Sequence, residues 1–253
     1  MISIESVSFS YTDGPNIFQD FSWRVERGTA WAVLGPSGCG KTTLLYLLAG
    51  LQFPSAGGVL VDEQPITRPR PQTGLILQEY GLLPWATVRQ NIALGLQVRA
   101  FYGPDGRHAP PQPADPADVE SWLKRLGLAD HARKYPGQLS GGQRQRTAIA
   151  RTLILQPDLL LMDEPFSALD APTRLDLEDL TLQLRQEQRF TFVIVTHTIE
   201  EAAYLGQSVL VLGRTPNHAG KIFSNPVFGQ PGGRDSTAFR ELCAALRAEL
   251  EER

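Results

Sequence analysis

A glycine-rich segment at residues 35–42 sets narrow limits on the architecture. Gly35-Pro36-Ser37-Gly38-Cys39-Gly40-Lys41-Thr42 matches the pattern G-x-x-x-x-G-K-[ST], and it lies between an apolar strand-like segment and a helix-like segment that starts at Thr43. In such a loop, successive backbone N–H groups point at phosphate oxygens, and the helix that follows adds its positive N-terminal end. We expect Lys41 to bind the β- and γ-phosphates of a nucleotide and Thr42 to bind Mg²⁺. A chance glycine-rich turn is the alternative, and the position between strand and helix disfavours it.

Two adjacent acids end an apolar segment later in the chain. In Leu159-Leu160-Leu161-Met162-Asp163-Glu164 the apolar residues predict a buried strand, with both carboxylates at its carboxyl end. Open α/β sheets bind ligands at that edge, and Mg²⁺ prefers oxygen ligands. We expect Asp163 to bind Mg²⁺ and Glu164 to orient or deprotonate an attacking water, which typically contributes about 10²–10⁴-fold in rate. Taken alone, the pair could also be two solvated loop acids.

The sequence Leu139-Ser140-Gly141-Gly142-Gln143 predicts a second anion-binding helix start. Ser140 stands where an N-cap is expected, and the two glycines leave the first N–H groups of the helix uncovered. One nucleotide does not obviously need two such sites in a single chain. An ordinary Ser-capped helix is the alternative for this segment taken alone.

Hydrophobic patterning predicts an α/β fold. Alternating apolar residues at 2–11 and 21–25 predict antiparallel strands, with a turn at Asp13-Gly14-Pro15-Asn16 between them. Helical stretches separate a series of apolar runs, which predict a mostly parallel sheet with helices on both faces; the runs are 31–34, 73–77, 159–162, 191–195 and 209–212. Residues 88–154 are mostly helical in pattern. We therefore expect an N-terminal antiparallel β subdomain and an inserted helical subdomain.

Two further segments depart from this pattern. Gly103 to Pro116 is rich in proline and predicts an exposed loop, because proline lacks an N–H donor and fixes its own backbone. Residues 234–253 predict an amphipathic C-terminal helix that docks through its apolar face, with Asp235 or Ser236 as N-cap. We expect residues 1–233 to form the main domain.

Charge and cysteine content exclude few classes. The net charge of -3 gives no reason to expect a nucleic-acid partner. Two cysteines, Cys39 and Cys243, are too few for a disulfide scaffold and favour a reducing compartment. Neither a signal peptide nor an apolar run of about 20 residues is visible, so we expect any membrane role to come through a partner. Cys39 at a helix N-terminus is expected to have thiolate character; an unreactive buried residue is the alternative.

The phosphate loop, the Ser140 segment and the strand before Asp163 together resemble the ATP-binding cassette (ABC) ATPases, over nearly the whole chain. The resemblance implies a P-loop ATPase core that binds ATP and Mg²⁺. It implies that Gln78 touches Mg²⁺ or water, that His197 contacts the γ-phosphate, and that Ser167-Ala168-Leu169-Asp170 is the D-loop. Tyr11 occupies the place of the aromatic that stacks on adenine, although it could equally pack on the sheet.

Two copies face head to tail in this family, so Ser140 of one copy would cap the ATP that Lys41 of the other holds. That arrangement would explain two anion-binding helix starts in one chain. The expected catalytic residues are Glu164, His197 and Gln78, and the expected metal ligands are Thr42, Gln78 and Asp163. The expected nucleotide contacts are Tyr11, Gly35, Pro36, Ser37, Gly38, Cys39, Gly40, Lys41, Thr42, Thr43, Ser140, Gly141, Gly142 and Gln143.

Two other segments resemble import ATPases of the nitrate, sulfonate and taurine group: Glu79-Tyr80-Gly81-Leu82-Leu83-Pro84-Trp85 with Asn91-Ile92-Ala93-Leu94, and Arg234-Asp235-Ser236 with Phe239 and Leu242-Cys243. This implies a homodimer of ATPase subunits at the cytoplasmic face of the cell membrane, integral-membrane permease subunits, and an extracytoplasmic substrate-binding protein that acts through the permease. A soluble ABC ATPase outside transport is the alternative, although long heptads and a second cassette are missing. The Ser140 segment and His197 argue against a small-molecule kinase.

Overall fold

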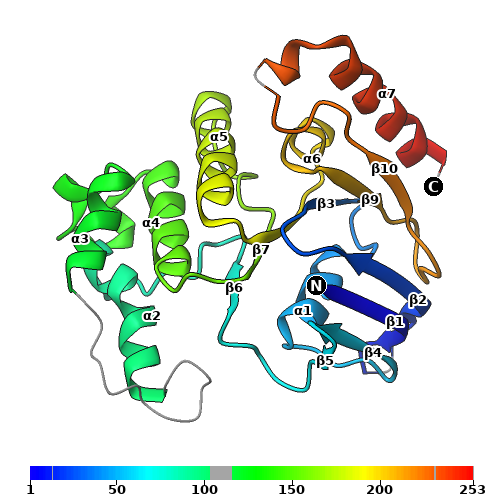
Figure 1. Cartoon of the computed structure of the whole chain (residues 1–253), viewed down its shortest axis with the longest axis horizontal. Helices are drawn as coiled ribbons and strands as arrows, with labels where there is room; N and C mark the ends of the chain where they lie inside the picture. Colours follow the sequence, from blue (N-terminus) through cyan, green and yellow to red (C-terminus); the bar gives the residue numbers. More distant parts are fainter. Residues whose placement is uncertain (13, 103–115, 231, 253) are drawn as a thin grey trace. The chain divides into compact units, whose positions relative to one another are not determined.

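The computed structural model describes residues 1–12, 14–102, 116–230 and 232–252. The chain divides into two compact units, and each is described by itself (Figure 1). The first unit comprises Met1–Arg70, Leu161–Glu164 and Arg185–Arg253, and the second comprises Pro71–Leu160 and Pro165–Leu184.

The first unit contains an antiparallel sheet built from the N-terminal strands. Its order is β2 (Asn16–Val25), β1 (Ile2–Ser10), β4 (Ala56–Val61) and β5 (Gln64–Pro65). Figure 1 shows β1, β2 and β4 side by side. On β1 the apolar residues that alternate in the sequence are buried, namely Ile2, Ile4, Val7 and Phe9. The predicted antiparallel β subdomain is confirmed.

A second, mostly parallel sheet contributes to the same unit the strands that follow the order β10-β9-β3-β8-β7, with β7 only from Leu161. Strand β3 (Ala30–Leu34) pairs in parallel with β8 (Thr191–Val195) and with β9 (Ser208–Val211). Strand β10 (Lys221–Ser224) is antiparallel to β9. Every residue of β8 and of β7 (Leu159–Asp163) is buried, as expected of central strands with continuous apolar runs.

Three helices complete the first unit. Helix α1 (Lys41–Ala49) follows β3, and α6 (Ile199–Leu205) contacts both β3 and α7 (Thr237–Glu252). Before α7, a short 3₁₀ turn, η3, spans Gly233–Asp235. The Ser236 hydroxyl accepts a hydrogen bond from the Phe239 N–H at 3.1 Å. Of the two predicted caps Ser236 is therefore the correct one, because Asp235 lies in the 3₁₀ turn.

The second unit is mainly helical. Helix α2 (Val88–Tyr102) contacts α3 (Pro116–Arg125) and α4 (Gly141–Leu153), and α4 also contacts strand β6 (Thr73–Ile76). Two 3₁₀ turns, η1 (Ala129–His131) and η2 (Pro136–Gln138), precede α4, while α5 (Ala171–Gln188) begins in this unit. The Asp158 N–H donates to the Gln72 carbonyl at 3.0 Å, where β7 starts beside β6. The prediction of a mostly helical segment at 88–154 is confirmed for its described residues.

The proline-rich loop lies outside the described residues except for Pro116, which begins α3 instead of ending a loop. Proline is tolerated at a first helical position, because its missing N–H would have no intrahelical partner there. Asp13 of the predicted turn also lies outside the described residues. Within the described ranges, no helix has both the length and the apolar character that crossing a bilayer requires.

Candidate functional site

The segment between β3 and α1 forms a tight loop whose backbone favours glycine at two points. Gly38 and Gly40 have φ angles of 78° and 101°, in the left-handed region. A Cβ added to Gly40 would lie 2.4 Å from Cγ2 of Ile17. No side chain caps the start of α1. The first N–H groups of this helix are therefore not covered by a side chain, which suits an anion.

Lys41 is buried at the start of α1 and points back over the loop. Its Nζ donates to the carbonyl oxygens of Gly35 at 2.8 Å and Pro36 at 3.0 Å. An ammonium group has three donors. Two of them therefore position the charge over the loop, and the third can bind a phosphate oxygen.

Asn217 braces the loop from a different part of the chain. Its Nδ2 donates to the Cys39 carbonyl at 2.8 Å, and its Oδ1 accepts from the Gly213 N–H at 2.9 Å. The side chain is buried. Sequence reasoning missed Asn217, because a lone Asn after proline has the pattern of a surface turn.

Cys39 does not have the thiolate character expected of it. Its side chain is 1% exposed, and burial raises the pKa of the thiol. The charge of Lys41 and the nearby backbone N–H groups act in the opposite direction but are outweighed. The structure therefore favours the alternative, a small buried residue without reactivity.

Thr42 and Asp163, the two expected metal ligands of the first unit, lie together. Thr42 Oγ1 donates to Asp163 Oδ1 at 3.1 Å. Two neighbouring ligands of an octahedral Mg²⁺ with bonds of about 2.1 Å lie about 3 Å apart, so this pair fits that ion. Within the described residues, no group of three or more His, Cys, Asp or Glu side chains has an arrangement that could hold a metal ion. Such a sparse set suits Mg²⁺, which commonly uses one or two protein oxygens together with substrate phosphates.

The surroundings of Asp163 disfavour the ionised form of its carboxyl group. Burial raises the pKa of its carboxyl, and the negative charge of Glu164 adds to this effect. The hydrogen bond from Thr42 and the charge of Lys41 lower the pKa and only partly compensate. A cation beside Asp163 would remove this electrostatic penalty.

Glu164 and His197 form the second pair at the same edge of the sheet. Glu164 Oε2 lies 3.1 Å from His197 Nδ1. The Glu164 backbone has a φ of 42°, which is uncommon for a residue with a side chain, and its N–H donates to the Val195 carbonyl at 2.9 Å. Strained residues of this kind cluster at functional sites. The bond to Val195 joins the ends of β7 and β8 and directs both side chains to one place.

Tyr11 lies next to Thr43 at the start of α1 and is also packed on the antiparallel sheet. Its hydroxyl is 3.2 Å from Oγ1 of Thr43, and its ring meets Phe9 edge-on with centroids 5.1 Å apart. The residue is 44% exposed. Stacking of its ring on adenine stays a prediction.

In the second unit, Ser140 caps α4 in a reciprocal arrangement. Its Oγ accepts from the Gln143 N–H at 3.3 Å, while Gln143 Oε1 accepts from the Ser140 N–H at 3.0 Å. A Cβ on Gly141 would lie 2.8 Å from Leu169 Cδ2, and one on Gly142 would lie 2.6 Å from Thr173 Cγ2. The two glycines are therefore also required for packing against the start of α5.

Two more expected residues lie in the second unit. Gln78 is exposed, two residues beyond the end of β6. Asp170, at the end of the predicted D-loop, accepts from the Thr173 N–H at 3.3 Å and so stands at the start of α5. A hydrogen bond from the Thr173 side chain, together with this bond from its N–H, lowers the pKa of the Asp170 carboxyl. The roles of both residues stay predictions.

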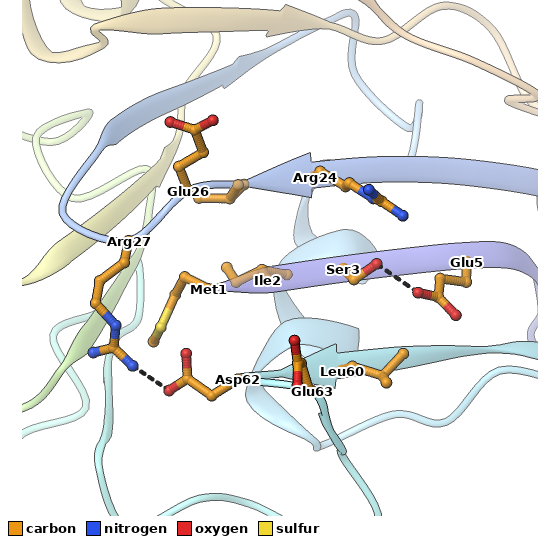
Figure 2. Close-up of a pocket in the computed structure, with 11 residues that line it drawn as sticks. Met1, Ile2, Ser3, Glu5, Arg24, Glu26, Arg27, Leu60, Asp62 and Glu63 are labelled. Atoms are coloured by element: carbon orange, nitrogen blue, oxygen red, sulfur yellow. Dashed lines mark hydrogen bonds and ion pairs between the residues drawn. The ribbon is translucent and has the colours of Figure 1, made fainter.

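A separate hollow of about 790 Å³ lies on the antiparallel sheet of the first unit (Figure 2). Charges of both signs line it, and Arg27 pairs with Asp62 at its edge. Ser3 Oγ donates to Glu5 Oε1 at 2.8 Å within it. None of the expected site residues lines this hollow.

Comparison with known proteins identifies the family of this chain. The ABC transporter family model matches residues 18–167. The aliphatic sulfonates import ATP-binding protein SsuB of Bacillus cereus is 36% identical over 253 residues, which cover 99% of this chain and 96% of that protein. The nitrate import ATP-binding protein NrtC of Synechocystis sp. is 39% identical over 230 residues, covering 90% of this chain and 33% of that protein.

A solved structure extends the comparison. The dimeric ATP-binding cassette MJ0796, in a post-hydrolysis state with ADP and Pi, superposes with a TM-score of 0.76 at 27% identity, covering 90% of this chain and all of that one. The phosphate loop, the acids that end β7 and a sequence match along the whole chain thus lead to one assignment: this chain is a member of the ABC transporter family and an ATP-binding ATPase.

Proposed function

We propose that this chain is the ATPase subunit of an ABC importer and that it hydrolyses Mg-ATP through the residues gathered at one edge of the parallel sheet. The observation that carries the proposal is the pairing of Thr42 with Asp163 and of Glu164 with His197 beside the phosphate loop. Each pair joins residues far apart in the sequence. Side chains for metal binding and for proton transfer lie next to the residues that hold phosphate.

In this proposal the phosphate loop binds the nucleotide. Its backbone N–H groups and Lys41 Nζ hold the β- and γ-phosphates, and the ring of Tyr11 supports the adenine. Thr42 Oγ1 and Asp163 Oδ1 would hold Mg²⁺. The family resemblance is the only support for Gln78 as a further ligand. When bound, Mg²⁺ neutralises negative charge on the phosphates.

Hydrolysis then requires an oriented water. The Glu164 carboxylate accepts a proton from that water. At the same time the water oxygen bonds to the γ-phosphorus, and the bond between the γ-phosphorus and the bridging oxygen breaks. His197 stands beside Glu164 with Nδ1 toward the carboxylate. In its imidazolium form it donates to Glu164 through Nδ1 and can donate to the transferring phosphoryl group through Nε2. Such groups act mainly by positioning and by stabilising charge.

We further propose that two copies of the chain bind ATP between them. Ser140, Gly141 and Gly142 of one copy would cap the nucleotide bound to Lys41 of the other, with Gln143 holding Ser140 in place. Support comes from the capping box at α4 and from the dimeric, nucleotide-bound form of the related cassette. Closure with ATP and opening after hydrolysis would drive transport.

The partners follow from the names of the relatives. We propose that integral-membrane permease subunits bind the dimer at the cytoplasmic face of the membrane and that an extracytoplasmic binding protein delivers the substrate to them. Since the relatives import aliphatic sulfonates and nitrate, small oxyanions of the nitrate, sulfonate and taurine type are the proposed cargo. Within the chain we propose an ATPase domain at 1–233, with an inserted helical subdomain at 88–154, and a docking helix at 234–253.

Hydrolysis of Mg-ATP by the purified chain tests the catalytic part. Glu164→Gln should retain ATP binding, lose nearly all turnover and accumulate as an ATP-bound dimer in size-exclusion chromatography. Unchanged steady-state turnover in this variant would remove Glu164 from its role.

The composite site has its own test. A mixture of Ser140→Arg and Lys41→Ala chains retains one intact site per heterodimer, so it should occlude ATP although neither variant does so alone. The absence of occlusion in the mixture would contradict the two-chain site while leaving ATP binding by Lys41 unaffected. For the importer assignment, the chain should co-purify with a permease and support ATP-dependent uptake of a sulfonate or nitrate into proteoliposomes.

A further inference from the structure

His197 lies in a short loop between β8 and α6, and the residues on both sides of it are held by one hydroxyl group. We infer that Thr196 and Glu201 are positioning residues for His197. This inference rests on the role proposed above for His197. It concerns side chains that no sequence motif singled out.

Thr196 and Glu201 are joined by a buried hydrogen bond. Thr196 Oγ1 donates to Glu201 Oε2 at 2.7 Å. Thr196 is 1% exposed and Glu201 is 3% exposed. A hydrogen bond to a carboxyl group in so dry an environment is stronger than one at the surface, and its loss leaves a buried polar group unsatisfied.

The same hydroxyl group also forms a hydrogen bond with the backbone of the loop. Thr196 Oγ1 also accepts from the Thr198 N–H at 3.0 Å, so it spans His197 from one side to the other. The Thr196 N–H donates to the Val33 carbonyl at 3.1 Å. Val33 lies in β3, two residues before the phosphate loop begins at Gly35. The backbone before His197 is thus bonded directly to β3, the strand that carries the phosphate loop. The backbone after His197 is bonded to the side chain of Thr196 and so is held indirectly to the same strand.

Glu201 can serve as an anchor because α6 is itself firmly held. Asn225 Nδ2 donates to the carbonyls of Ala203 at 2.7 Å and Gly206 at 2.8 Å, the last residues of the helix region. Helix α7 contacts α6 (Figure 1).

The consequence concerns rate rather than binding. His197 is itself 55% exposed in its side chain, so little packing fixes the imidazole directly. Its place beside Glu164 depends on the backbone that carries it. A displacement of about 1 Å in a catalytic group can cost about 10²-fold in rate. Loss of the Thr196 hydroxyl is therefore expected to lower kcat while the phosphate loop still binds ATP.

The test compares matched variants in steady-state Mg-ATP hydrolysis. Thr196→Val removes the hydroxyl and retains the side-chain shape, whereas Thr196→Ser retains the hydroxyl. Glu201→Gln retains an acceptor oxygen, and Glu201→Ala removes it. Glu200→Gln is the control, since Glu200 is the exposed neighbour on the same helix.

We expect Thr196→Val and Glu201→Ala to lower kcat by roughly 10- to 100-fold with KM for ATP within about twofold. Thr196→Ser and Glu201→Gln should retain most of the wild-type kcat, and Glu200→Gln should behave as wild type. In a His197→Ala background, Thr196→Val should cause no further loss, because residues that act through one group are not additive.

Other results would overturn the inference. An unchanged kcat in Thr196→Val, a rise in KM without a fall in kcat, or an equal additional loss in the His197→Ala background would each show that Thr196 does not act through His197. If Glu201→Ala does not fold, Glu201→Gln and the Thr196 pair still decide the question. Wild-type hydrolysis in the same assay separates this outcome from failure of the proposed function, which would show no turnover in any variant.

Discussion

Thr42 Oγ1 donates to Asp163 Oδ1 across 3.1 Å and so joins the first turn of α1 to the end of β7, 121 residues further along the chain. Both residues are proposed metal ligands, and both belong to the first unit. The hydrogen bond holds the two oxygens in place but does not offset the burial of the carboxylate, since the pKa of Asp163 is raised. The ionised carboxylate is therefore in place to bind a cation, but without the cation it lowers the free energy of unfolding.

The first prediction concerns this cost. A raised folded-state pKa means that ionised Asp163 opposes folding at neutral pH, and that the penalty disappears as the pH falls below its ordinary pKa. Asp163→Asn retains an acceptor for Thr42 without the charge. Without nucleotide and Mg²⁺, it should raise the midpoint of thermal unfolding at pH 7.5, by about 2–4 °C per kcal/mol of penalty removed.

The pH dependence of that difference is the check. The gain should shrink as the pH is lowered through the window between the raised and the ordinary pKa of Asp163, and hydrolysis should be lost at every pH. Glu63→Gln, which removes an exposed acid from the antiparallel sheet, controls for the change in net charge. A variant with a lower midpoint than wild type at pH 7.5 would contradict the prediction.

Long apolar runs made the central sheet predictable. Strands β7 and β8 are buried on both faces, so each leaves a continuous signal in the sequence. Strand β4 starts with Ala56-Gly57-Gly58, which has the pattern of a turn. Gly57 has a φ of 77°, and a Cβ there would lie 2.3 Å from the Glu5 carbonyl of β1. Its place in a strand depends on a partner some fifty residues away, which a local pattern cannot show.

The site was predictable where chemistry and local spacing coincide. The phosphate loop needs its glycines and its lysine within eight residues, so the motif is visible in one segment. The pairing of Glu164 with His197, the brace from Asn217 and the burial of Cys39 depend on how distant segments pack. Cys39 was misjudged for this reason: its helix-terminal position is a local property, whereas its exposure is a property of the fold.

The second prediction tests the loop. Gly40→Ala would place a Cβ 2.4 Å from Ile17 Cγ2 at a φ of 101°, so both sterics and backbone strain oppose it. We expect loss of ATP binding and a lower thermal midpoint. Gly28→Ala is the matched control, because Gly28 has a φ of 72° with nothing within 4 Å of the added Cβ. That control should cost only about 1 kcal/mol of left-handed strain and leave binding intact. Equal effects from the two variants would mean that strain alone, and not the crowding at Gly40, is responsible.

The third prediction concerns thiol reactivity. Because burial raises the pKa of Cys39 and of Cys243, both thiols should react far more slowly with iodoacetamide in the native protein at pH 7.5 than in denaturant. Mass spectrometry of labelled peptides measures each rate separately. Mg-ATP should change the Cys39 rate little, since the side chain is already inaccessible. Rapid labelling of Cys39 that Mg-ATP prevents would restore the thiolate hypothesis.

The last prediction concerns Arg151, which holds the loop that follows Gln78 within the second unit. Its Nη1 donates to the Gly81 carbonyl at 2.7 Å and its Nη2 to the Tyr80 carbonyl at 3.1 Å, and burial lowers its pKa. A lysine keeps the charge but not the planar fork that reaches two carbonyls. We expect Arg151→Lys to lose about 1–3 kcal/mol of unfolding free energy and some ATPase activity, because the two carbonyls lose the charged, paired donor that holds them. Arg89→Lys is the control, since the exposed pair of Arg89 with Glu120 should contribute about 0–1 kcal/mol. If denaturant midpoints show equal losses for the two variants, the fork of Arg151 is not what holds the loop.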